Sequence, residues 1–123
     1  MAEGGEAFFN WLNSLCSALH KKLEQVFNKQ FIYDFQLAQE AVQNSIRMWH
    51  EGEIGHFYHD ETDARFEVVA CASINCSDMQ TLQEIVDSWL CSPGHTQALS
   101  NHSVIGVGLS YSSGMIYATA RLR

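Results

Sequence analysis

Two histidines and one glutamate stand where this sequence changes from one predicted element to the next. His59 precedes a short apolar segment, Glu67 lies at the start of that segment, and His95 follows a helical stretch that contains tryptophan. Two imidazoles and a carboxylate with an open position for water suit zinc or a similar divalent ion. The same trio suits general acid–base chemistry. Loop histidines are also common as plain solvated side chains, so residue type alone leaves both interpretations open.

The segment from Trp89 to His95 places one of these groups. Its helix is expected to stop at Ser92-Pro93-Gly94, because proline lacks an N–H and pushes the preceding residue into extended geometry. We therefore expect His95 to leave the turn at a corner that faces a cleft. An ordinary exposed turn histidine is the alternative interpretation of the same spacing.

Hydrophobic periodicity predicts the helices that must position these groups. Apolar residues recur at steps of three and four over 6–28 and over 34–49, where Asp34 is the expected cap, and again in a helix that begins at Ser77 or Asp78. All three tryptophans are expected in the core. The predicted buried side of the first helix carries Phe8, Leu12, Leu15, Leu19, Leu23 and Val26, and that of the second carries Leu37, Ala38, Ala41, Val42, Ile46 and Trp49.

Three further segments predict strands. The segment 66–74 is apolar and contains small residues, and 104–111 and 115–122 are joined by a hairpin signal at Ser112-Ser113-Gly114. The order of helices, strand, helix and hairpin predicts an α/β fold in which one small central sheet has helices on both faces, a three-layer α-β-α sandwich. The length of 123 residues predicts a single domain over 1–123.

Composition excludes several classes of function. The net charge of −7 argues against a nucleic-acid binder and against a basic membrane-surface module. No apolar run is long enough for a transmembrane segment, and the first residues lack the basic region of a signal peptide. The four cysteines, Cys16, Cys71, Cys76 and Cys91, form no C-x-x-C motif. Buried thiols and disulfides both remain open, and with them the redox compartment.

The motifs resemble those of the CAP superfamily, which includes cysteine-rich secretory proteins, antigen 5 and pathogenesis-related class 1 proteins, and most of all its compact bacterial SCP-type domains. The most specific match is Trp89-x-x-Ser92-Pro93-Gly94-His95, followed by Ile105-Gly106-Val107-Gly108. The resemblance covers about residues 8–123. Its supporting segments are Leu37-Ala38-x-x-Ala41, Phe57-Tyr58-His59, the stretch from Phe66 to Ser73, and Tyr117-x-Thr119.

The resemblance implies a cleft built from His59, Glu67, Ser92 and His95, with His59 and His95 as the metal ligands and His56 as the alternative first histidine. Zinc or another divalent cation is the implied cofactor. The sequence departs from the family pattern at Phe66, where a glycine is usual, at Val68, where an asparagine is usual, and at Ser92, where eukaryotic members carry a second glutamate.

Three functions follow from this resemblance. The first is a non-catalytic binding module whose cleft holds a divalent ion or a small ligand and which meets an unknown protein or lipid partner. The second is a metal-assisted hydrolase or protease, in which Glu67 acts as base to a metal-bound water. The third is a lipid or sterol binder that uses the apolar face of the first helix. The resemblance implies a secreted, extracellular protein, and a cytoplasmic one is the alternative.

Overall fold

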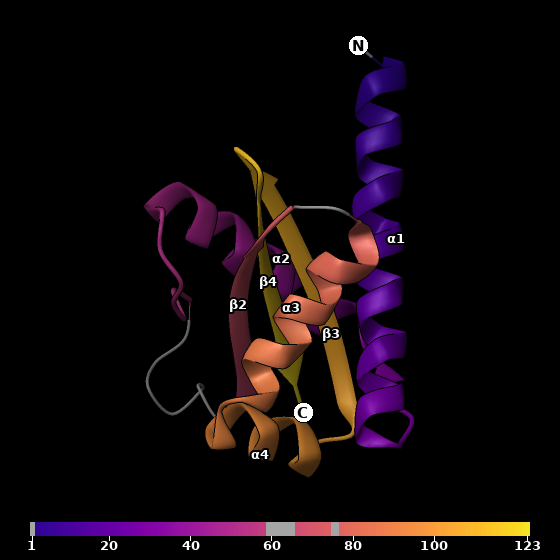
Figure 1. The fold of residues 1–123 in the computed structure, drawn as a ribbon, viewed down its shortest axis with the longest axis vertical. Helices are drawn as coiled ribbons and strands as arrows, with labels where there is room; N and C mark the ends of the chain where they lie inside the picture. The colour runs from indigo at the N-terminus through magenta and orange to yellow at the C-terminus, as the bar shows by residue number, and fades with distance from the viewer. Residues whose placement is uncertain (1, 59–65, 75–76) are drawn as a thin grey trace.

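The computed structural model describes residues 2–58, 66–74 and 77–123, which form four helices and one sheet of four strands (Figure 1). The expected α/β class is therefore confirmed. In chain order the described elements are α1 (Ala2–Phe27), β1 (Ile32–Tyr33), α2 (Phe35–Glu51), β2 (Glu67–Ser73), α3 (Asp78–Leu90), α4 (Pro93–Asn101), β3 (Val104–Ser112) and β4 (Met115–Leu122).

The sheet has the strand order β1-β3-β4-β2. β3 and β4 form the predicted hairpin, and its turn residues Ser113 and Gly114 have φ of 52° and 80°, as a two-residue turn that matches the strand twist requires. β2 pairs antiparallel to β4, so that Glu67 lies opposite Arg121, and β1 pairs parallel to β3. This register places the start of β2 beside the end of β4.

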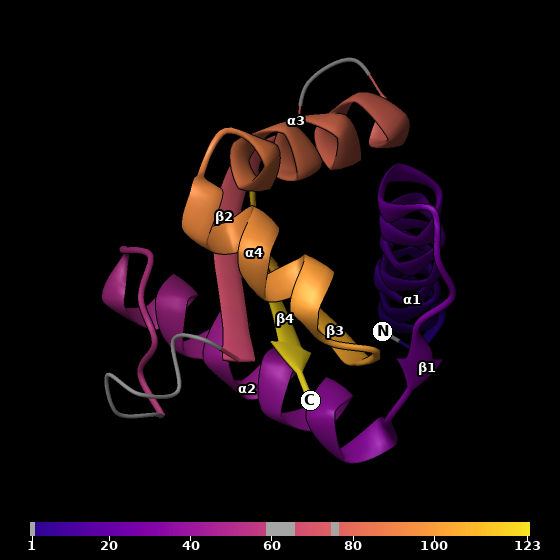
Figure 2. The ribbon, with the colours of Figure 1, turned by 90° about the horizontal axis from the view of Figure 1, so that it is seen from below.

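The main core lies on the face of the sheet that α1 and α3 cover. Leu15, Leu19 and Leu23 of α1 pack there with the alternate side chains of the strands. Trp89 of α3 is fully buried, and its indole N–H donates to the carbonyl of Val69 at 3.0 Å. α4 follows α3 and lies across the lower end of this layer, as Figure 2 shows from below. The start of β2 and the first turn of α4 therefore meet at one end of the molecule.

The opposite face of the sheet is covered by α2. A Cβ on Gly106 would lie 2.1 Å from the backbone nitrogen of Ala38, and one on Gly108 would lie 2.2 Å from that of Val42. The two glycines therefore let the backbone of α2 lie directly on β3. Ser45 tightens the contact, because its hydroxyl donates to the carbonyl of Gly108 at 2.8 Å.

The helix caps agree with the sequence. Asp34 caps α2 by accepting the N–H of Leu37, and Ser77 caps α3 by accepting that of Gln80. α2 ends at Gly52 in the left-handed conformation. None of the described helices contains a stretch long and apolar enough to cross a membrane.

Several sequence expectations are wrong. Pro93 does not leave His95 in a turn, because it begins α4 and places His95 in the first turn of that helix. Proline suits this position, since the first N–H groups of a helix have no intrahelical acceptor. β1 was not expected. Phe8, Val26, Ile46 and Trp49 lie more than a third exposed, and the ring of Trp49 stacks on His50 instead of entering the core.

Candidate functional site

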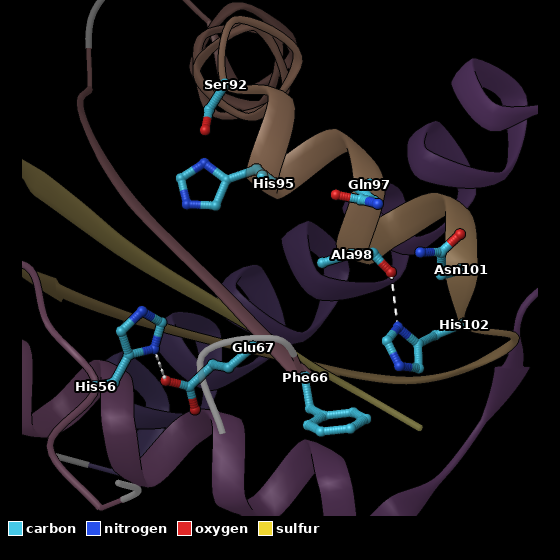
Figure 3. A pocket seen from close by; sticks show the side chains of 10 residues that line it. His56, Phe66, Glu67, Ser92, His95, Gln97, Ala98, Asn101 and His102 are labelled. Atoms are coloured by element: carbon cyan, nitrogen blue, oxygen red, sulfur yellow. Dashed lines mark hydrogen bonds and ion pairs between the residues drawn. The ribbon is translucent and has the colours of Figure 1, made fainter. Parts of the chain in front are cut away.

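A cavity of about 560 Å³ opens where the start of β2 meets α4 and the loop after α2 (Figure 3). Three of the four cleft residues expected from sequence, Glu67, Ser92 and His95, line this cavity, and so does the alternative histidine, His56. The fourth, His59, lies outside the described residues. Segments far apart in the sequence thus contribute an imidazole, a carboxylate, a hydroxyl and a second imidazole to one space.

Glu67 is fully buried, and its partner on the cavity side is His56. The two are joined by a 2.5 Å contact between His56 Nδ1 and Glu67 Oε1. An ionised carboxylate only accepts hydrogen bonds, so the proton in this contact lies on Nδ1, and the ring nitrogen turned away from the carboxylate is Nε2. Figure 3 shows that this second nitrogen points away from Glu67, toward the space below His95.

Arg121 pairs with the same carboxylate. Its Nη1 lies 3.6 Å from Glu67 Oε2, and its Nε lies 3.4 Å from Glu40 Oε1. A buried carboxylate is tolerated only where charges and hydrogen bonds compensate its lost hydration. His56 and Arg121 provide that compensation at different oxygens of the carboxylate, and they fix the direction of the Glu67 side chain.

His95 faces His56 across the cavity from the first turn of α4. Its Nδ1 is buried and has no hydrogen-bond partner among the described residues. Burial lowers the pKa of His95 below 6.5, and the charge of nearby His56 lowers it further. The ring is therefore neutral at pH 7 and offers a nitrogen lone pair to the cavity. Ser92 lies beside it, and its hydroxyl makes no capping hydrogen bond to α4.

The far end of the cavity has a different chemistry. Phe66 and His102 meet edge to face with their ring centroids 5.0 Å apart. His102 Nδ1 lies 2.7 Å from the carbonyl of Ala98, which makes that nitrogen the donor and fixes the ring. Gln97 and Asn101 add carboxamides from α4. His102 is thus a cavity histidine whose ring is held by a backbone carbonyl of α4.

Sequence reasoning missed Asn44, which lies on α2 and is fully buried. Its carboxamide donates to the carbonyl of Gly55 at 2.9 Å and accepts the N–H of Phe57 at 2.8 Å. These are the residues on either side of His56. The signal was present in the sequence as a polar residue at the helical spacing of the buried positions Ala41 and Met48.

The cavity carries side chains of the types that bind divalent cations, among them the imidazoles of His56 and His95 and the carboxylate of Glu67. Within residues 2–58, 66–74 and 77–123, no group of three or more histidine, cysteine, aspartate or glutamate side chains is placed to hold a metal ion. His56 and His95 offer two imidazole nitrogens, and Glu67 orients His56 as carboxylates orient metal-binding histidines elsewhere. An ion held there would take its other ligands from solvent or from a bound molecule.

Comparison with known proteins identifies structural neighbours only. No family model matches the sequence, and no curated protein does. The fold is similar to that of an outer surface protein from Borrelia burgdorferi, with a TM-score of 0.59, 19% identity and 90% of each chain covered. It is also similar to a hookworm platelet inhibitor, with a TM-score of 0.53, 11% identity, and coverage of 89% of this chain and 67% of that one.

Proposed function

We propose that this chain is a CAP-type binding module that takes zinc or a similar divalent cation between His56 and His95. The observation that carries the proposal is the 2.5 Å pairing of His56 with Glu67 on one side of a cavity that His95 lines from the other. Carboxylate-oriented, neutral imidazoles are the ligands that zinc prefers in proteins. The ion, when bound, supplies a positive centre and open coordination positions for a ligand.

The finer architecture belongs to the same proposal. Placement of α2 on one face of the sheet and of α1 and α3 on the other supports the three-layer α-β-α sandwich that the CAP resemblance implies. One structural neighbour is an outer surface protein, which supports an extracellular location. The partner we propose for the module is a protein or a lipid, as the resemblance implies.

A binding role is preferred to hydrolysis because of how Glu67 is held. A metal-assisted hydrolase needs a base free to take a proton from the bound water. Glu67 is engaged by His56 on one oxygen and lies near Arg121 on the other, so its direct task is to orient His56. Lipid or sterol binding by α1 remains a prediction of the resemblance.

The experiment is a titration of the metal-free protein with zinc at pH 7.5 and at pH 5. Calorimetry measures the zinc affinity, and thermal unfolding measures the stabilisation of the fold. Zinc at a hundredfold excess over its dissociation constant should stabilise the fold by about 2.7 kcal/mol at pH 7.5. The effect should be much smaller at pH 5, because ligation requires neutral histidines. His56→Ala and His95→Ala should each remove most of it.

Two further variants decide which histidines matter. His102→Ala removes an imidazole from the same cavity whose Nδ1 is bonded to the Ala98 carbonyl, so it should leave the zinc response intact. His59→Ala tests the first histidine that the family resemblance implies, and a small effect is expected if His56 is the ligand. Zinc binding that survives both His56→Ala and His95→Ala would show that the ion binds elsewhere.

A further inference from the structure

Asn44 makes three hydrogen bonds from a fully buried position on α2. Its Nδ2 donates to the Gly55 carbonyl at 2.9 Å and to Thr119 Oγ1 at 3.2 Å, and its Oδ1 accepts the Phe57 N–H at 2.8 Å. A carboxamide can donate and accept at once, and here it uses both functions on one short stretch of backbone. Neither a carboxylate nor an aliphatic side chain can do both.

The two backbone groups that Asn44 binds flank His56 on either side. His56 lies beyond the left-handed cap at Gly52, in a segment that belongs to no helix or strand. Helix and sheet hydrogen bonds therefore do not fix its backbone. The pair of bonds from Asn44 replaces them, and it ties the segment to the same α2 surface that packs on β3 and β4.

We propose that Asn44 is the positioning residue that holds the His56 imidazole against Glu67 and toward His95. Backbone angles restrict the rotamers that a side chain can adopt, so a backbone clamped at Gly55 and Phe57 limits where the His56 ring can lie. Glu67 then selects the tautomer with the proton on Nδ1, which leaves Nε2 facing the cavity. The inference rests on the proposed function, because His56 is the cation ligand there.

Ser45 provides a matched control for a merely structural role. It is the next residue of α2 and is equally buried. Its hydroxyl donates to the Gly108 carbonyl at 2.8 Å, and it lies 2.9 Å from Thr119 Oγ1. Ser45→Ala therefore removes hydrogen bonds from the same α2–sheet contact without touching the backbone around His56.

The first experiment measures the His56 ring without any metal, by long-range proton–nitrogen NMR at pH 7.5. The wild type should show the proton of His56 on Nδ1, and Ser45→Ala should keep it there. Asn44→Leu should move His56 toward the usual mixture of tautomers, dominated by the proton on Nε2. If the leucine variant does not fold, Asn44→Ala serves in its place, because it leaves room for water at the freed backbone groups. The same change in the position of the His56 ring proton is expected for it.

The second experiment measures zinc affinity in the same set. Loss of a residue that orients a ligand typically weakens metal binding by about 10–100-fold, and we expect that range for Asn44→Ala but less than about threefold for Ser45→Ala. The Asn44 inference is overturned if the His56 ring is unchanged in both Asn44 variants, or if Ser45→Ala alters it equally. Failure of the wild type to bind zinc overturns the cation proposal alone, since the NMR result stands without metal.

Discussion

The surroundings of His95 disfavour the charged form of its imidazole. Its ring is partly buried on α4 and faces His56, and both the burial and the neighbouring positive charge disfavour the imidazolium form. Glu67 also lines this cavity, but its Oε1 is already committed to His56. The result is an imidazole that stays neutral at pH 7, at the cost of stability in acid.

This leads to a prediction for the metal-free protein. Because the folded-state pKa of His95 is lowered below its unfolded value near 6.5, the unfolded chain binds the proton more readily. Stability from the neutral ring is complete above pH 6.5 and is lost as the pH falls below it. His95→Gln should therefore show a smaller drop in unfolding free energy between pH 7.5 and pH 5, measured by urea denaturation with a chelator present.

His102→Gln is the control for that experiment, since His102 lies in the same cavity and its Nδ1 is bonded to a carbonyl. It removes another imidazole from the cavity and so tests whether a change in acid sensitivity is specific to His95. Equal pH dependence in wild type and His95→Gln would contradict the prediction, and would mean that other groups govern the acid response of this end of the molecule.

Local sequence patterns pointed to residues that line the cavity, but not to the contacts that each of these residues makes there. Spacing around Ser92-Pro93-Gly94 singled out His95, and the strand start singled out Glu67. Neither could reveal that Glu67 orients His56 or that Asn44 clamps the backbone around it. Those roles depend on how a segment outside any regular element folds back on α2, and hydrophobic periodicity carries no information about such a segment.

At the scale of elements, long periodic segments were predictable and short ones were not. α1, α2, α3 and the β3–β4 hairpin lie close to where periodicity and caps placed them. The sequence patterns do not predict α4, because Pro93 reads as the end of the preceding helix. Proline is equally suited to the first turn of a helix, and that is where Pro93 lies. β1 has two residues, and its pairing with β3 is a long-range contact that no local pattern contains.

The contact between α2 and β3 gives a sharp prediction. A Cβ at Gly106 would lie 2.1 Å from the backbone nitrogen of Ala38, so Gly106→Ala must push the helix away from the sheet. We expect a loss of about 3 kcal/mol or more in unfolding free energy, at the upper end of overpacking effects. Chemical denaturation followed by circular dichroism measures it.

Gly94→Ala is the control for the glycine prediction. Gly94 lies in α4, and among the described residues the nearest contact of a Cβ built on it is the Ser92 hydroxyl oxygen, at 4.0 Å. Replacing a helical glycine with alanine at an open position should raise stability by about 0.5–1 kcal/mol. A Gly106→Ala protein as stable as the wild type would mean that α2 does not lie on β3 as closely as described.

Across the whole molecule, the three described cysteines are free and differ in accessibility. Cys91 is exposed at the end of α3, and Cys71 is half-buried on β2, where burial raises the pKa of its thiol. Cys16 packs against the main core, and burial raises the pKa of its thiol to about 11. Cys76 lies outside the described residues, so the expected choice between thiols and disulfides is resolved only for the other three.

Alkylation of the native protein without a reducing agent should therefore label Cys91 first and Cys16 last. Mass spectrometry of the digested protein measures the labelling of each cysteine-containing peptide. The Cys16 thiol is partly buried against the main core, so it becomes fully accessible only when the fold opens. Gly106→Ala should speed the labelling of Cys16 about tenfold for every 1.4 kcal/mol of lost stability, while the rate at Cys91 stays the same. Labelling of Cys16 as fast as Cys91 in the wild type, or a disulfide-linked peptide pair, would contradict this.

The labelling rate of Cys16 thus reports the stability of the whole fold, and it gives the zinc proposal an independent readout. A cation bound between His56 and His95 should slow the labelling of Cys16 about tenfold for every 1.4 kcal/mol by which it stabilises the protein.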